Sequence, residues 1–353
     1  MNSDETGLLH AIYDEPFDVV PRRVYADWLE DQGATGLAAL QRMWMPDGSH
    51  KDLDQWWQQR KDLQYQVGKE APEGISLHLG DEGELWALVP SGWKTADTLD
   101  LDSLHRWMSR HHVWRLSLAQ TIGSLMRWIR HPMVGQLIGL GCSDGLASLF
   151  VGLSHTHRFP HVVDLHLDTF RGPLDGLRWL LERGEFPQLR WLTPGGRYSP
   201  AEMRRFLRDR AIQKVNRVRL HMGDLENLRD ADLNDLCPLP AVRSLVLVDE
   251  RLRRGRPRAE RLIRQVFPGL QSLTLIVPCG QTLSRLPEAM DLEQLRELRV
   301  HSCVENAEDQ LIHVAEKLPA TACFSFCEDE PSPGLIDRLS EMLGPRFRHE
   351  TYP

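Results

Sequence analysis

Residues 239–247 read LPAVRSLVL and residues 267–275 read FPGLQSLTL, and these two stretches share one pattern. A leucine or an aromatic residue precedes a proline, and three apolar residues then follow, separated first by two positions and then by one. Residues 159–167 (FPHVVDLHL) and residues 186–194 (FPQLRWLTP) repeat this order. Alternation of apolar and variable residues is typical of a short strand with one buried face, so each stretch predicts a strand.

The pattern recurs at nearly constant spacing through the second half of the chain. Successive copies begin 27, 26, 27, 28, 25 and 26 residues apart. Their first positions are Val162, Leu189, Val215, Val242, Leu270, Leu295 and Thr321. Further copies are expected upstream at Val113/Leu116/Leu118 and Val134/Leu137/Gly139, with a weak one at Gly74/Leu77/Leu79. Such a repeat indicates stacked units, because a single unit of this size cannot bury its apolar face alone.

Helical segments separate the predicted strands. Residues 172–184 carry leucines at helical spacing, and residues 199–202 (SPAE) have the Ser, Pro and Glu of a capping box. Residues 306–318 and the stretch that begins at Ser332-Pro333 predict two more helices. Strands that alternate with helices form a parallel sheet with the helices on its other side. The sequence therefore predicts an α/β array over residues 105–353.

This array resembles the leucine-rich repeats of the ribonuclease-inhibitor type, in which each unit contains a strand and a helix. The resemblance covers about residues 105–345 and implies a leucine-rich-repeat-like solenoid. Such repeats usually carry Asn or Cys three residues after the last strand leucine. Cys303 occupies that place in its unit, whereas Phe170, Gly223 and Glu250 occupy it in others.

Residues 1–70 predict a small all-α N-terminal domain. Pro21 suits a helix start, Gly33 suits a helix end, and residues 51–67 suit a further helix. The run Arg22-Arg23-Val24-Tyr25-Ala26-Asp27-Trp28-Leu29-Glu30 resembles the core motif of the bacterial repeat-companion domain, which lies beside leucine-rich repeats. The resemblance implies a companion role for a bacterial protein but no chemistry. We expect Trp28 in the core, and Asp27 in a helix cap or in an ion pair with Arg22 or Arg23.

Residues 71–104 contain Trp, Gly and Asp without a clear period, and we expect an irregular insertion or cap there. The chain is 41% hydrophobic and 26% charged, which is ordinary for a globular protein. Its N-terminus shows no basic region followed by an apolar core, and no stretch has the length of a membrane span. We therefore expect a cytoplasmic protein. The formal net charge of −8 gives no general reason to expect a nucleic-acid partner.

Two motifs leave alternative functions open. Residues 139–145 (GLGCSDG) precede Asp164, and a glycine-rich turn there could hold a nucleotide pyrophosphate. The arginine run at 251–261, with Arg253, Arg254 and Arg256, could grip nucleic-acid phosphates or an acidic protein surface. The histidines around His157 lack further metal ligands. We predict no catalytic residues, no metal and no cofactor.

The variable positions of the predicted strands define a candidate binding face, because neighbouring side chains on a strand point to opposite sides. This inner face carries Asp164, His166, Trp191, Arg217, Arg219, His221 and Arg299. An exposed tryptophan beside arginines is typical of an interface hot spot, so we expect Trp191, Arg217 and Arg219 to bind a partner. The sequence favours a non-catalytic protein-recognition or scaffold subunit, with regulation of an effector enzyme as one role that this architecture allows.

Overall fold

A computed structural model describes the chain over the following residues: 1–44, 53–80, 84–89, 98–118, 128, 130–142, 159–167, 177–178, 181–194, 200–221, 236–248, 259–276, 283–284, 286–287, 292–301, 307–327 and 332–350. The chain divides into two compact units, Met1–Gly196 and Arg197–Pro353. Both units combine helices with a largely parallel sheet, which confirms an α/β fold. Among the helices that the structure describes, none has the length and apolar character that a membrane span requires.

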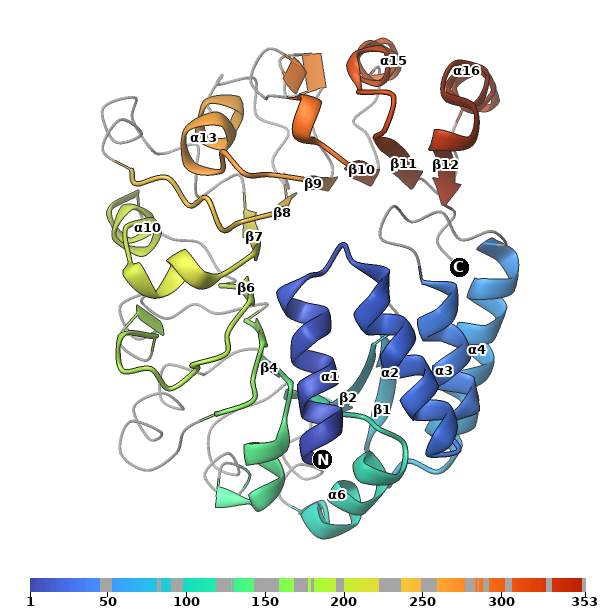
Figure 1. The fold of residues 1–353 in the computed structure, drawn as a ribbon, viewed down its shortest axis with the longest axis vertical. Helices are drawn as coiled ribbons and strands as arrows, with labels where there is room; N and C mark the ends of the chain where they lie inside the picture. The colour runs from blue at the N-terminus through green and yellow to red at the C-terminus, as the bar shows by residue number, and fades with distance from the viewer. Residues whose placement is uncertain are drawn as a thin grey trace. The chain divides into compact units, whose positions relative to one another are not determined.

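The first unit begins with four helices and continues as a sheet (Figure 1). Its helices are α1 (Ser3–Asp14), α2 (Val19–Asp31), α3 (Thr35–Met43), α4 (Leu53–Lys69), α6 (Leu101–Arg110) and the 3₁₀ helix η1 (Pro132–Gln136). Its strands are β1 (Ser76–Leu79), β2 (Leu85–Val89), β3 (Arg115–Leu118), β4 (Gly139–Cys142), β5 (Asp164–His166) and β6 (Trp191–Thr193). The N-terminal helices and the first strands thus belong to one compact unit. A helical domain over residues 1–70 stays a prediction.

The strands of the first unit follow one another in chain order. Strand β1 pairs with β2 in antiparallel fashion, and each later pair, from β2–β3 to β5–β6, is parallel. The predicted irregular segment at 71–104 thus contains β1 and β2. The weak copy at Gly74/Leu77/Leu79 falls on the antiparallel strand β1, so it is not a unit of the parallel array.

The register of β4 corrects one predicted copy of the repeat. Leu140 pairs with Leu116 of β3 and with Leu165 of β5, so Leu140 occupies the middle apolar position of this unit. The unit therefore reads Leu137/Leu140/Cys142 instead of Val134/Leu137/Gly139. The prediction was wrong because Gly139 was counted as an apolar position, whereas it faces the other side of the sheet.

The predicted ends of the N-terminal helices are partly confirmed. Helix α2 begins after Asp18, whose carboxylate accepts a hydrogen bond from the Val20 backbone N–H, so Pro21 lies inside the first turn and does not start the helix. Gly33 follows α2 with φ of 79°, a left-handed conformation that glycine adopts at little cost. Helix α4 confirms the helix expected over residues 51–67.

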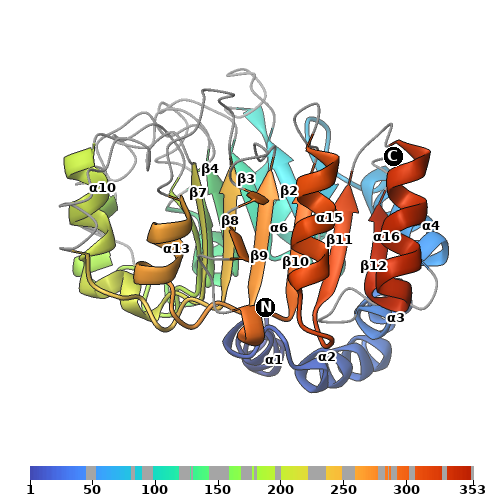
Figure 2. The ribbon, with the colours of Figure 1, turned by 90° about the horizontal axis from the view of Figure 1, so that it is seen from above.

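The second unit repeats strand and helix in parallel order. Its strands are β7 (Arg217–His221), β8 (Ser244–Val248), β9 (Ser272–Ile276), β10 (Glu297–His301), β11 (Cys323–Cys327) and β12 (Phe347–Glu350). Its helices are α10 (Pro200–Leu207), η2 (Arg210–Lys214), α13 (Ala259–Val266), η3 (Leu292–Gln294), α15 (Glu308–Lys317), α16 (Pro333–Leu343) and η4 (Gly344–Arg346). Helices α10, α13, α15 and α16 all lie on one side of these strands (Figure 2).

The core of the second unit lies between its strands and these helices. The middle apolar positions of β7 to β11 pair in register from Val218 through Leu245, Leu273 and Leu298 to Phe324, and all five are fully buried. The predicted copies over this part of the chain are confirmed as strands. Strand β12 adds a further parallel strand that the repeat pattern did not indicate.

Candidate functional site

One row of side chains crosses the parallel strands that the structure describes in the first unit. The strand register places Trp86, Arg115, Gly139, Asp164 and Trp191 side by side, on β2, β3, β4, β5 and β6. We call these five residues the inner row, and the sheet face that carries them the inner face. Alternation along each strand turns the neighbouring leucines to the opposite side.

Gly139 makes room for the Arg115 side chain within the inner row. A β-carbon at Gly139 would lie 2.6 Å from Arg115 Cγ and 3.1 Å from Trp86 Cη2, so both side chains occupy the space over the glycine. Arg115 is buried, and burial lowers the pKa of its guanidinium to about 10, while the charge of Asp164 acts in the opposite direction. The glycine between them therefore allows a buried cation and a buried carboxylate to share one row.

Gly141, the second glycine of the glycine-rich motif, makes room for a side chain of the next row. Gly141 pairs with Ser117 of β3 and His166 of β5, and a β-carbon at Gly141 would lie 2.8 Å from Ser117 Oγ. The His166 and Trp86 rings meet in a T-shaped arrangement, with ring centroids 6.3 Å apart. Gly139 and Gly141 thus lie within strand β4, and not in the strand-to-helix turn that the nucleotide hypothesis requires. Residues 143–145 of this motif lie outside the described residues.

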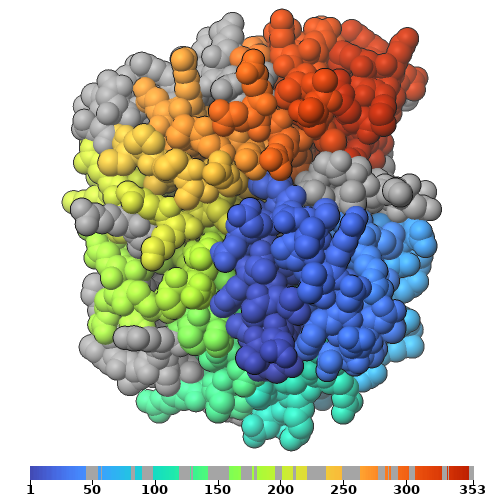
Figure 3. All heavy atoms as spheres, in the orientation of Figure 1, coloured from blue at the N-terminus to red at the C-terminus, as the bar shows by residue number. Residues whose placement is uncertain are grey.

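Helix α1 packs on two residues of the inner row, Trp191 and Arg115. The Tyr13 ring meets Trp191 edge to face at a centroid distance of 4.5 Å, and the Arg115 guanidinium lies 5.3 Å from the Tyr13 ring. Tyr13 is 2% exposed and Trp191 is 5% exposed. In the space-filling view, the blue atoms of the N-terminal helices lie against the green atoms of the same unit (Figure 3).

This contact corrects the predicted binding face in the first unit. We expected Trp191 to be exposed at an interface with another protein, and this was wrong because α1 of the same chain covers it. Asp164 is also buried, at 7% exposed, and His166 is half-buried. Strand periodicity identifies the side of the sheet on which a residue lies, but not what covers that side.

Polar contacts surround the buried contact of Tyr13. Arg190 Nε donates a hydrogen bond to Asp14 Oδ1 at 2.5 Å, and His10 Nε2 lies 3.4 Å from the backbone oxygen of His161. Burial lowers the pKa of His10. Burial also lowers the pKa of His161, and the neighbouring His10 adds to this effect. His10, Tyr13 and Asp14 lie on one face of α1, at the spacing of neighbours on a helix.

The buried Glu5 carboxylate joins α1 to two other segments. Its Oε1 accepts a hydrogen bond from the Tyr25 hydroxyl at 3.2 Å and lies 2.8 Å from His112 Nδ1. Burial, and next the charge of Glu5, raise the pKa of Tyr25. His112 has φ of 53°, which is uncommon for a residue with a side chain, and its ring contacts Trp28 edge to face at 5.4 Å.

The residues of the companion motif therefore have structural roles. Tyr25, Ala26 and Leu29 are buried, whereas Trp28 is half-buried and packs on His112 instead of lying in the core. Asp27 Oδ1 pairs with Arg42 Nη2 at 2.7 Å, so the expected pairing with Arg22 or Arg23 was wrong.

Arg22 itself is buried within the helical part of the first unit. Its guanidinium lies 3.8 Å from the centre of the Trp44 ring and donates to Gln41 Oε1 at 3.2 Å. These contacts join α2 to the end of α3, which explains why an arginine is buried at this position.

A small cavity lies where α1, α2 and α3 meet the sheet. Its volume is about 30 Å³, and its lining includes Tyr13, Tyr25, His112, Arg115 and Trp191. A cavity of this size holds one or two water molecules, whereas sites for small-molecule ligands measure about 300 Å³ or more. The cavity is therefore too small for a nucleotide or a metabolite.

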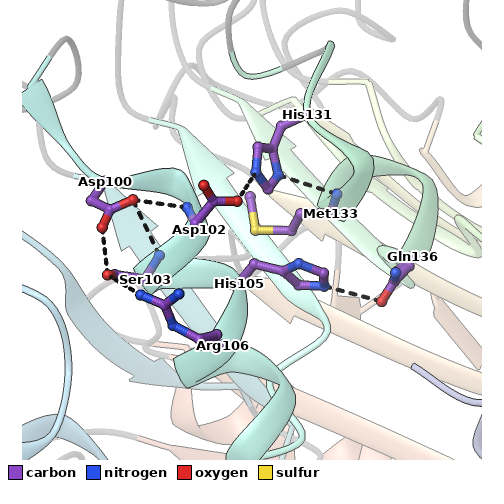
Figure 4. Close-up of polar contacts among 8 residues, drawn as sticks. All are labelled: Asp100, Asp102, Ser103, His105, Arg106, His131, Met133 and Gln136. Atoms are coloured by element: carbon purple, nitrogen blue, oxygen red, sulfur yellow. Dashed lines mark hydrogen bonds and ion pairs between the residues drawn. The ribbon is translucent and has the colours of Figure 1, made fainter.

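A polar cluster fixes the segment that leads into β4 (Figure 4). His131 Nδ1 accepts a hydrogen bond from the Met133 backbone N–H at 3.2 Å, so Nε2 carries the ring proton and donates to Asp102 Oδ1 at 3.1 Å. His105 Nε2 lies 3.2 Å from Gln136 Oε1. These contacts join α6 to η1. Within the described ranges, no group of three or more His, Cys, Asp or Glu side chains is arranged to hold a metal ion.

The inner face of the second unit carries the remaining predicted residues. Arg217 and Arg219 lie on β7 and are half-exposed, and His221 ends the same strand. The row of Arg219 continues through Val246, Thr274 and Arg299. This face thus combines two neighbouring arginines with small and apolar side chains.

Internal contacts engage some polar groups of this face. Arg299 Nη2 donates to Glu297 Oε1 at 3.0 Å, and the Ser272 hydroxyl donates to Glu297 Oε2 at 2.8 Å. Arg348 Nη2 lies 3.6 Å from Cys323 Sγ. Arg219 differs from these residues, because in the described part of the chain its side chain makes no hydrogen bond or ion pair.

Sequence reasoning missed several residues of these two faces. Tyr13 gave no signal, because it belongs to the apolar stripe of a helix and reads as ordinary core. Trp86 lies on β2, which the repeat pattern did not indicate, and Arg348 lies on the unpredicted β12. Arg253, Arg254 and Arg256 lie outside the described residues. No protein-family model matches the chain, and no curated protein shows significant similarity to it.

Proposed function

We propose that this protein is a non-catalytic recognition module, built as a leucine-rich-repeat-like solenoid, which binds an acidic segment of a partner protein on the inner face of strands β7–β10. The parallel strands in constant register, with helices on one side, support the solenoid. The resemblance of the α2 motif to the repeat-companion domain agrees with this architecture.

The half-exposed Arg219, which has no internal partner among the described residues, carries the proposal. Arg217 lies two positions away on the same side of β7 and extends the positive charge. A guanidinium offers several donors in a planar fork that matches a carboxylate, and arginine is enriched among the residues that dominate binding. Thr274 on β9 and Arg299 on β10 share the row of Arg219 and are half-buried, whereas Ser244 and Val246 on β8 are buried.

Affinity capture with charge-reversal variants tests this proposal. Immobilised wild-type protein and the Arg217→Glu/Arg219→Glu variant are incubated with extract of the source cells, and the retained proteins are identified by mass spectrometry. Arg264→Glu/Arg296→Glu is the matched control, because both residues are exposed arginines of the same unit that lie off the inner face of β7. We expect a partner that the wild type and the control retain and the β7 variant loses.

The purified partner then gives the decisive measurement. Loss of a dominant interface residue costs about 2 kcal/mol or more, so we expect at least a thirtyfold weaker dissociation constant for the β7 variant. Replacing the acidic residues of the partner's segment with basic residues should restore its binding to the Arg217→Glu/Arg219→Glu variant. Equal affinity of wild type and β7 variant for every retained protein would overturn the proposal.

A further inference from the structure

The buried inner row has the composition of a protein interface and not of a permanent core. Trp86, Arg115, Asp164 and Trp191 lie on the inner face, where Tyr13 of α1 contacts Arg115 and Trp191. Leu116, Leu140, Leu165 and Leu192 fill the opposite side of the same strands. Burial of the Arg115 and Asp164 charges costs their hydration, so these residues stabilise a core less than apolar residues of similar size do. Tryptophan, tyrosine and arginine are the residues enriched where proteins bind one another.

Helix α1 contacts this row in the way that a bound helical ligand does. Its residues His10, Tyr13 and Asp14 form one stripe, with the tyrosine between Trp191 and Arg115 and the carboxylate on Arg190. A helix that presents such anchors to a concave face is a common mode of peptide recognition. The anchor is buried, and the Asp14–Arg190 pair lies at the solvent-exposed edge.

We propose that the inner row is a second recognition surface, which binds an amphipathic helix carrying an aromatic residue followed directly by a carboxylate. Helix α1 is the internal occupant of this surface and competes with an external helix of the same chemistry. Because α1 is tethered, it acts at an effective concentration of about millimolar. An external helix that makes the same contacts binds only when the internal contact is weakened.

A synthetic peptide provides the external helix for the test. The probe is a fluorescein-labelled peptide with the sequence of residues 1–17, and its binding to the full-length protein is followed by fluorescence anisotropy. We expect the Tyr13→Ala variant of the full chain to bind the peptide at least tenfold more tightly than the wild type. Adding Trp191→Ala should abolish that gain, and so should Tyr13→Ala in the peptide.

Asp14→Arg provides a second variant that keeps the buried Tyr13. Asp14 is exposed, so the substitution removes the contact with Arg190 without opening the core. Glu15→Arg is the matched control: Glu15 is the adjacent exposed acidic residue, and its side chain makes no hydrogen bond or ion pair in the described part of the chain. We expect Asp14→Arg to bind the peptide more tightly than the wild type, and Glu15→Arg to bind it no more tightly.

A charge swap separates specific docking from general loosening. Arg190→Asp in the full chain should bind a peptide that carries Asp14→Arg more tightly than the unmodified peptide. The absence of binding by Asp14→Arg and Tyr13→Ala, or binding that Trp191→Ala leaves unchanged, would overturn the proposal. Strands β7–β10 take no part in these measurements, so the result is independent of the function proposed above.

Discussion

Tyr13 of the first helix meets Trp191 of the sixth strand edge to face, with ring centroids 4.5 Å apart. Together with the Asp14–Arg190 ion pair, this contact joins helix α1 to the β5–β6 end of the sheet in the first unit. Tyr13 also lies against the Arg115 guanidinium, so one tyrosine packs on two residues of the inner row. The predictions below test the residues that support this contact.

Gly139→Ala should destabilise the first unit. The added methyl group would lie 2.6 Å from Arg115 Cγ, so Arg115 and Trp86 must shift away from their packed positions. Overpacking of this kind costs about 1–3 kcal/mol, measured as a lower free energy of unfolding in urea. Gly135→Ala is the control, since a β-carbon there has no neighbouring atom within 4 Å. Equal effects of the two substitutions would contradict the close packing of the inner row.

Arg115→Met should cost more stability than the loss of its packing explains. The substitution removes the buried positive charge with which the Asp164 carboxylate interacts across Gly139, so it removes a favourable electrostatic interaction as well as packing. In the background of Asp164→Asn, the same substitution should cost much less. A double-mutant cycle from urea unfolding measures this coupling. Additive effects of the two substitutions would show that the charges do not interact.

Glu5→Ala should destabilise the packing of α1 on α2 and on the sheet. It leaves the buried Tyr25 hydroxyl without its acceptor, at a cost of about 1–3 kcal/mol. Glu5→Gln keeps an acceptor oxygen and should cost less. Thermal unfolding compares these variants with Glu15→Ala, which changes an exposed carboxylate of the same region and should have little effect.

Acidic pH should weaken the contact between α1 and β5–β6. The pKa values of His10 and His161 are lowered in the folded protein, chiefly by burial, so the folded state binds these protons more weakly than the unfolded state does. Their neutral forms carry no penalty above the unfolded pKa of about 6.5, and stability falls as the pH drops through that value.

Asp14 and Arg190 face His10, and the Met1 amine faces His161, so a difference measurement is required. The free energy of unfolding is measured from pH 8 to pH 5 for the wild type and for His10→Gln/His161→Gln. We expect a smaller loss of stability toward acid in the double variant. Parallel curves for the two proteins would rule out a role for these histidines.

The repeat pattern predicted strands β7 to β11 because each of them carries the same spacing of apolar residues. Val218, Leu245 and Leu273 appear at regular spacing, and the structure pairs them in register. The same reasoning failed at Gly139, because glycine is compatible with either side of a strand. The repeat pattern did not predict strand β2, because the segment before this strand lacks the leucine or aromatic residue followed by proline that precedes several of the copies.

The sequence predicted on which side of the sheet the candidate site residues lie, but not whether these residues are exposed. The alternation in β6 placed Trp191 on the inner face, as its register with Asp164 shows. Its burial depends on Tyr13, which lies in a helix with an ordinary apolar stripe. The local sequences around Tyr13 and Trp191 do not predict that the two side chains meet. A single sequence therefore could not indicate that helix α1 covers Trp191.

The contact of Tyr13 with Trp191 also sets an order of events during synthesis. The ribosome delivers the first helix long before it delivers the sixth strand, and domains form as their segments emerge. Helix α1 can pack on α2 early, but its contact with Trp191 forms only after β6 has left the exit tunnel. A contact between segments so distant in the sequence forms late and slowly, because bringing the two ends of the intervening chain together lowers its conformational entropy. In a nascent chain, helix α1 therefore completes its packing only after the ribosome has synthesised strand β6.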